Sequence, residues 1–262
     1  MYLQPIVRAK DGWLDSFNQH QILLNLQNPE VVIIGDSISK GLQRYSDVWK
    51  ENFSSTLNLG VGGDRVEHVL WRIQNYLFPA SVKVVIVICG TNNIGKNNTK
   101  LIAATLEYAA ECLLKLKVKP WIMTLLPRGL VPSKEREAVK SVNSLLTANL
   151  HCVDVSYGWV NVESKLLRME LFHTDFLHLS SAGNSKLACH LKFCINTAGS
   201  IDPRRTKEHP ERSNDGKRRI LRTRDELNRQ SSTAATVTFN DTRDSGDTFW
   251  GLSKMSKKLS LC

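Results

Sequence analysis

Four short stretches of the sequence combine the residue types that acyl transfer requires. Ser37 offers a hydroxyl nucleophile, and His178 offers a base that can take up its proton. Asp175 lies three residues before this histidine and can fix the orientation of its imidazole ring. Gly63 and Asn92 can supply N–H donors to an oxyanion. The stretches are Gly35-Asp36-Ser37, Gly60-Val61-Gly62-Gly63-Asp64, Gly90-Thr91-Asn92-Asn93 and Asp175-Phe176-Leu177-His178.

Each stretch alone also has an ordinary structural explanation. The first is typical of a helix-capping turn, the Asn92-Asn93 pair is common in turns, and a lone His178 is more often structural. The glycine-rich turn resembles a phosphate-binding loop, but it has neither the GxxxxGK[ST] lysine nor the full GxGxxG spacing. All four together favour an acyl-transfer site.

The sequence gives little support to a metal or cofactor site. Its His, Cys, Asp and Glu residues show no convincing metal-ligand spacing, and the nearest candidates are His173 and Asp175. The six tryptophans are scattered without an evident platform on which bases could stack. We therefore expect neither metal nor cofactor.

Apolar runs that alternate with helical patterns must position these residues. Apolar runs that end in glycine or proline predict buried strands, and apolar residues spaced three and four positions apart predict helices. Asp64 is the predicted N-cap of the helix over 65–75. This alternation predicts an α/β fold, a three-layer α/β/α sandwich with a five-stranded parallel sheet. The predicted strands span 31–34, 56–59, 83–89, 120–126 and 151–155, and the helices 13–26, 65–75, 99–117, 134–149 and 181–195.

The strand order along the chain places the chemistry. Ser37 follows the first strand, Gly63 the second and Asn92 the third. Ligands of open parallel sheets bind beyond the carboxyl ends of the strands, so all three are expected at one edge of the sheet. His178 precedes the last helix and is expected to fold back over that edge.

Charge and composition divide the chain of 262 residues into three parts. Residues 1–29 form an N-terminal segment, 30–196 the α/β domain, and 197–262 a basic, mostly disordered tail. The tail holds 14 Lys and Arg against 9 Asp and Glu, half of the net charge of +10. Its mixed charge favours a solvated tail over contact with nucleic acid. No apolar run has the length of a membrane span, and no signal peptide is visible. The six cysteines include no CxxC pair, which agrees with a reducing environment. We therefore expect a cytoplasmic protein.

At the four stretches the sequence resembles the SGNH (GDSL-type) hydrolase superfamily. It more narrowly resembles the catalytic subunits of platelet-activating factor acetylhydrolase type IB over about residues 31–195. That likeness rests on Leu57–Asp64 with Val69-Leu70-Trp71-Arg72, Gly90–Asn93, Leu125-Leu126-Pro127-Arg128-Gly129 and Asp175–Leu179. The resemblance implies a flavodoxin-like fold and cofactor-free hydrolysis of short acyl esters. It also implies a homodimer and a β-propeller regulatory partner, although the tail matches nothing in those subunits. The residues it implies are the triad Ser37, Asp175 and His178, the oxyanion donors Ser37, Gly63 and Asn92, and the acyl-pocket residues Ile38, Thr91 and Leu177.

The leading hypothesis is a serine esterase that removes a short acyl group, above all acetyl, from a small ester or a phospholipid. A carbohydrate or other O-acetyl esterase with the same machinery is the first alternative. A binding module without turnover, its tail in contact with nucleic acid, is the second. The complete set of nucleophile, base and oxyanion donors argues against a module that only binds.

Overall fold

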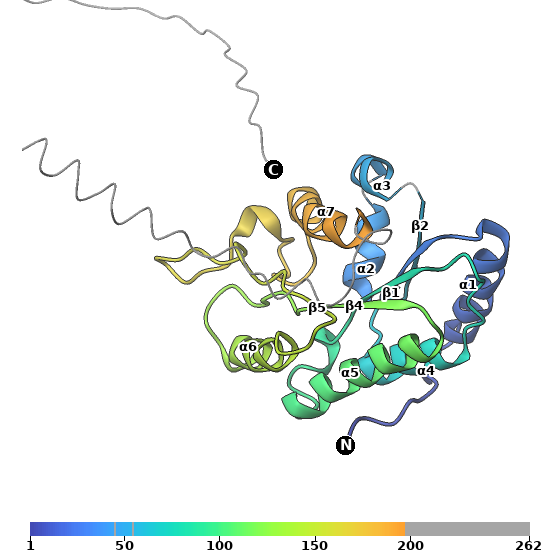
Figure 1. Cartoon of the computed structure of the whole chain (residues 1–262). Helices are drawn as coiled ribbons and strands as arrows, with labels where there is room; N and C mark the ends of the chain where they lie inside the picture. Colours follow the sequence, from blue (N-terminus) through green and yellow to red (C-terminus); the bar gives the residue numbers. More distant parts are fainter. Residues whose placement is uncertain (45, 54, 197–262) are drawn as a thin grey trace, which may run out of the picture. The chain divides into compact units, whose positions relative to one another are not determined.

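Five parallel strands form the centre of the fold (Figure 1). The computed structural model describes residues 1–196 except 45 and 54. The strands lie in the order β2-β1-β3-β4-β5, which is the flavodoxin-like order. They are β1 Val31–Gly35, β2 Thr56–Gly60, β3 Val84–Ile88, β4 Lys119–Met123 and β5 Cys152–Val153. The predicted fold class is confirmed.

Alternating strand residues face two separate cores. Val32 and Ile34 of β1 belong to one core, whereas Val31 and Ile33 belong to the other, because successive side chains of a strand point to opposite faces. Helices cover both faces, which makes the three layers (Figure 1). The first core packs against α1 Trp13–Gln27, α4 Val66–Asn75, α5 Thr99–Lys115 and α6 Lys134–Leu146, and the second against α2 Ser37–Gly41, α3 Ser46–Asn52 and α7 Ser181–Asn196.

The register of the central strands fixes the edge where the loops emerge. Gly35 at the end of β1 pairs with Gly60 at the end of β2 and with Ile88 at the end of β3. The chain after each of these strands therefore starts from neighbouring positions. This confirms that the segments bearing Ser37, Gly63 and Asn92 leave the sheet at one edge.

Two predicted strands are shorter than expected. The fourth was predicted over 120–126 but ends at Met123, and the fifth, predicted over 151–155, spans only Cys152–Val153. Beyond Met123, the side chain of Asn143 makes the backbone hydrogen bonds that a neighbouring strand would otherwise make. Its Oδ1 accepts from the Leu125 N–H and its Nδ2 donates to the Leu125 carbonyl, both at 2.8 Å.

The prediction that Asp64 caps the helix over 65–75 is wrong. Arg65 occupies the N-cap of α4, and its N–H donates to Nδ1 of His68 at 3.1 Å. The Asp64 carboxylate turns inward instead. The segment after Ser37, for which no element was predicted, forms α2, the 3-10 helix η1 Leu42–Arg44 and α3.

The N-terminal segment packs on the sheet-bearing body. Its helix α1 closely matches the predicted span of 13–26, and Trp13 is buried. Before it, the Leu3 N–H donates to Thr105 Oγ1 of α5 at 2.9 Å, and the Ile6 N–H to the Glu67 carbonyl of α4 at 3.3 Å. The predicted tail, residues 197–262, lies outside the described residues. Within the described part, no helix combines the length and apolar character that a membrane crossing needs; the cytoplasmic location stays a prediction.

Candidate active site

The structure brings Ser37, His178 and Asp175 into one chain of hydrogen bonds. Nε2 of His178 lies 2.9 Å from Oγ of Ser37, although the two residues are 141 positions apart. Nδ1 of His178 lies 2.6 Å from Oδ2 of Asp175. Ser37 begins α2 directly after β1, and the other two precede α7. This is the connectivity of a Ser-His-Asp triad.

The turn over 175–178 fixes the acid and the base relative to each other. Oδ1 of Asp175 accepts from the N–H groups of Leu177 at 3.0 Å and His178 at 2.9 Å, while Oδ2 faces the imidazole. Partial burial alone would raise the pKa of Asp175, but hydrogen bonds from the side chain and backbone of His178 and from Leu177 lower it on balance. The carboxylate is thus ionised at neutral pH and orients the ring.

Asp36 acts as the helix cap, and Ser37 nonetheless faces the histidine. Oδ1 of Asp36 accepts from the Ile38 N–H at 2.8 Å, and its carbonyl accepts from Ser39 Oγ at 2.8 Å. The turn therefore contains the predicted cap and also places Ser37 within hydrogen-bond distance of His178. Burial raises the pKa of Asp36 to about 7, with repulsion from Asp64 adding to it and the Ile38 hydrogen bond opposing it.

The two predicted oxyanion donors meet at Asp64. Gly63 has φ of +81°, which favours glycine, and ends a turn that stays close to β1 because the Val61 N–H donates to the Gly35 carbonyl at 2.9 Å. Nδ2 of Asn92 donates to the carbonyl of Asp64, the next residue, at 2.9 Å. An amide nitrogen carries two hydrogens, so this bond positions Asn92 while leaving a second donor.

Ile38, Thr91 and Leu177 line one small cavity of about 20 Å³. Asp36 also lines it, so both sequence neighbours of Ser37 contribute to its wall. A volume of this size holds roughly one water molecule or one methyl group. The three residues that the resemblance assigned to an acyl pocket thus share one cavity beside the serine.

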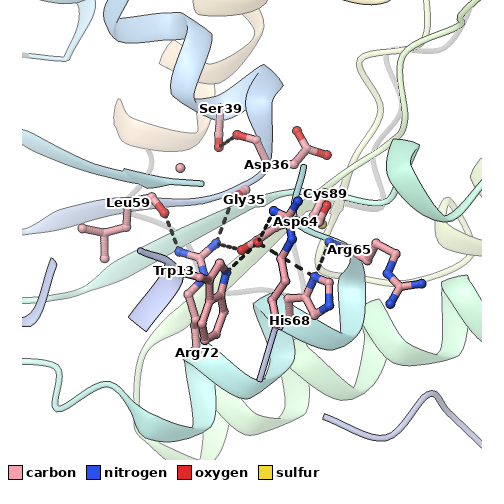
Figure 2. Close-up of polar contacts among 12 residues, drawn as sticks. Trp13, Gly35, Asp36, Ser39, Leu59, Asp64, Arg65, His68, Arg72 and Cys89 are labelled. Atoms are coloured by element: carbon pink, nitrogen blue, oxygen red, sulfur yellow. Dashed lines mark hydrogen bonds and ion pairs between the residues drawn. The ribbon is translucent and has the colours of Figure 1, made fainter. Parts of the chain in front are cut away.

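A buried ion pair lies beneath the site and joins its loops (Figure 2). Nη2 of Arg72, on α4, lies 2.8 Å from Oδ2 of Asp64, and both side chains have no exposed surface. Arg72 also donates to the Gly35 carbonyl at 2.8 Å and to the Leu59 carbonyl at 2.5 Å. One guanidinium therefore binds the ends of β1 and β2 and the residue that follows Gly63.

The N-terminal segment completes this cluster. Nε1 of Trp13 donates to Oδ1 of Asp64 at 2.8 Å (Figure 2). Nη1 of Arg8 donates to the Gly62 carbonyl at 2.7 Å and lies 3.5 Å from Oδ1 of Asp64. Burial lowers the pKa of His68, which packs beside the carboxylate, although Asp64 and Glu67 oppose that effect. The segment thus shapes the turn that carries Gly63.

Sequence comparison relates the chain to a named group of hydrolases. It is 32% identical over 192 residues to human platelet-activating factor acetylhydrolase IB subunit alpha2. The aligned region covers 69% of this chain and 82% of that protein. It is 36% identical over 189 residues to the human alpha1 subunit, covering 68% and 80%. The chain belongs to the platelet-activating factor acetylhydrolase IB alpha-subunit family. It is thus a member of a family of acyl-ester hydrolases. No protein-family model matches it.

Solved structures support the same fold for this alpha-subunit homologue. A GDSL-like lipase from Bacteroides thetaiotaomicron superposes with a TM-score of 0.59 at 19% identity, covering 70% of this chain and 99% of the other. A lipase/acylhydrolase from Enterococcus faecalis gives a TM-score of 0.51 at 19% identity, covering 67% and 98%. At such identities these likenesses establish the fold.

Sequence reasoning assigned no role to the residues that support the site, although Arg72 and Arg128 lie in stretches that carry the family resemblance. Arg72 follows Val69 by three positions and precedes Ile73, so it lies beside the apolar face of an amphipathic helix. A charge at that position signals a buried partner, and this signal was available in the sequence. Arg128 was also missed; it donates to the Thr91 carbonyl at 2.9 Å and pairs with Glu135 at 3.0 Å. Among the described residues, no three His, Cys, Asp or Glu side chains gather to hold a metal.

The Asp64–Arg72 pair predicts strong coupling between two substitutions. Arg72→Met strands a buried carboxylate and is expected to lower the free energy of unfolding by about 3–5 kcal/mol. Adding Asp64→Asn removes the stranded charge, so the double variant should lose less than the sum of the single losses. Urea unfolding of the parent, the two single variants Arg72→Met and Asp64→Asn, and the double variant measures this. Lys140→Met, which breaks an exposed pair with Glu137, should cost less than about 1 kcal/mol. Additive losses at Arg72 and Asp64 would contradict the coupling.

The raised pKa of Asp36 predicts a dependence of stability on pH. The folded chain keeps this proton up to about pH 7, whereas the unfolded chain releases it near 3.8, the ordinary pKa of an aspartate side chain. The contribution is complete below the unfolded pKa and is lost as the pH rises through the folded one. Between pH 5 and pH 8 the parent protein should lose about 2–3 kcal/mol more unfolding free energy than Asp36→Asn. Urea unfolding at both pH values tests this, and an equal difference between the proteins at both would refute it.

Proposed function

We propose that the chain is a serine esterase that hydrolyses short-chain acyl esters, above all acetyl esters, through an acyl-enzyme. The observation that carries this proposal is the chain of hydrogen bonds from Ser37 through His178 to Asp175. It lies at the carboxyl edge of a parallel sheet, where ligands of such folds bind. Membership in a family of acyl-ester hydrolases agrees with it.

The first half of the reaction acylates the serine. His178 Nε2 takes the hydroxyl proton as Ser37 Oγ attacks the ester carbonyl, and Asp175 stabilises the imidazolium that forms. The N–H groups of Ser37 and Gly63 and the free amide hydrogen of Asn92 bind the oxyanion. The tetrahedral adduct then expels the alcohol, which takes the proton from Nε2, and leaves the acyl group on Oγ.

The second half releases the acid. His178 takes a proton from a water molecule, which attacks the acyl carbonyl, and the oxyanion is bound by the same donors. The adduct then breaks its bond to Ser37, whose oxygen regains the proton from Nε2. Asp175 needs to be ionised throughout, which its lowered pKa favours.

The size of the small cavity supports acetyl as the acyl group. Its volume of about 20 Å³ accommodates a methyl group, and the buried side chains Ile38 and Thr91 and the partly buried Leu177 leave no room for a longer chain. The two human relatives carry the name of an acetylhydrolase. On this basis we propose acetyl esters of small or lipid alcohols, phospholipids included, as substrates. The homodimer and the β-propeller partner stay predictions.

Four variants test the proposed machinery with p-nitrophenyl acetate. Ser37→Ala, His178→Ala and Asp175→Asn should each lower kcat by about 10⁴-fold, because each removes a member of the triad. Asn92→Ala should lower it by about 10²–10³-fold. The matched control is Ser185→Ala, an exposed serine of α7, which should retain parent activity. A parent protein no faster than Ser37→Ala would overturn the proposal.

The same assay tests the acyl preference. The parent should favour p-nitrophenyl acetate over the butyrate by at least about tenfold in kcat/KM, since each added methylene is excluded from the cavity. Leu177→Ala enlarges the cavity and should shift the ratio towards butyrate. A parent protein whose kcat/KM for the butyrate equals or exceeds that for the acetate would contradict the role assigned to the cavity.

A further inference from the structure

A second and larger cavity borders the same serine and histidine. Its volume is about 520 Å³, and Ser37 and His178 line it together with Lys40 and Arg44. The small cavity can hold only a short acyl group, so the larger one is the space available to the rest of an ester. This step rests on the proposed esterase function.

The helix that begins at the nucleophile carries the two basic residues on its serine side. Lys40 and Gly41 follow Ser37 by three and four positions in α2, and Arg44 follows by seven in the adjoining η1. Residues at these spacings share one face of a helix. Gly41 has no side chain, so it leaves the space between Lys40 and Arg44 open, and it lines the cavity itself.

The two charged side chains on the helical wall of this cavity, Lys40 and Arg44, are both positive. Lys40 and Arg44 are exposed, and no carboxylate pairs with either within the described part of the chain. The described lining residues include no Asp or Glu. A cleft lined by one sign of charge raises the local concentration of ligands of the opposite sign.

We propose that this cavity binds the alcohol half of the ester and that Lys40 and Arg44 select alcohols that carry an anionic group, a carboxylate or a phosphate. Lys40 lies about 5 Å along the helix axis from Ser37, and Arg44 about 12 Å, from the rise per residue of the α-helix and of the adjoining 3-10 helix. An anion a few bonds beyond the ester oxygen therefore reaches one or both side chains. Alcohols that bear a quaternary ammonium group are disfavoured by the same charges.

Matched phenyl acetates with a meta substituent test the charge preference in the full-length chain. The substituents are a carboxylate, its neutral methyl ester, a phosphate and a trimethylammonium group, and each rate is corrected for spontaneous hydrolysis. At low ionic strength the parent should show a kcat/KM ratio of anionic to neutral ester that is about tenfold above that of Lys40→Gln/Arg44→Gln. The ratio of trimethylammonium to neutral ester should rise in this double variant. Preference for either anion supports the proposal, and the larger ratio identifies the anion.

A control with the same change of net charge separates this effect from the overall field. Lys100→Gln/Lys134→Gln alters exposed lysines of α5 and α6 that do not line the cavity, and it should retain the parent ratio. Added salt should reduce the parent ratio towards that of the cavity variant, because exposed charges are screened. Equal ratios in the parent and the cavity variant, or an equal fall in the control, would overturn the inference.

Failure of the two proposals gives different results. If the parent hydrolyses p-nitrophenyl acetate in a Ser37-dependent way but shows no charge preference, the assignment of Lys40 and Arg44 is wrong and the esterase function stands. If the parent hydrolyses no acetate in the series faster than Ser37→Ala does, the esterase proposal is wrong and the inference is wrong with it.

Discussion

The ion pair between Arg72 and Asp64 is the contact on which the geometry of the site depends. Neither side chain has exposed surface, so the free energy of desolvating two charges must be recovered from their mutual attraction and their hydrogen bonds. Arg72 recovers it by binding the carbonyls of Gly35, the last residue of β1, and Leu59, the residue before the last of β2 (Figure 2). The planar guanidinium, with five donors, suits such a junction better than lysine would. Because the Asp64 carbonyl holds Asn92, the segments after three strands share one anchor.

In the proposed reaction, the acyl and alcohol halves of an ester occupy two cavities of very different size. One of about 20 Å³ lies beside Ile38 and one of about 520 Å³ beside Lys40, and both border the first turn of α2. The smaller limits the acyl group by volume, whereas the larger leaves the alcohol to be selected by charge. The two proposals thus give specificity for the acyl part and for the alcohol part separate physical origins.

The local sequence predicted most of the elements well, because they depend on short-range patterns, whereas the catalytic roles stay predictions. The predicted strand over 31–34 became β1, which places Ser37 at the sheet edge, and His178 lies beside it as predicted. The cap assigned to Asp64 was wrong for a different reason. An aspartate before a helix is a good cap, but this one finds Arg72 and Trp13, which lie 8 and 51 positions away and are brought near only by the fold. Asn143, which ends β4 early, is a second long-range contact of this kind.

The account places nucleophilic attack on a single hydroxyl, that of Ser37. Reaction of the full-length chain with a fluorophosphonate ester, followed by peptide mass spectrometry, tests this directly, because such reagents phosphonylate activated serines and stay attached. The account predicts one adduct per chain on the peptide that contains Ser37, slowed by an excess of an acetyl ester and absent from His178→Ala. A folded protein that forms no adduct, or one labelled elsewhere with Ser37 unmodified, would contradict it.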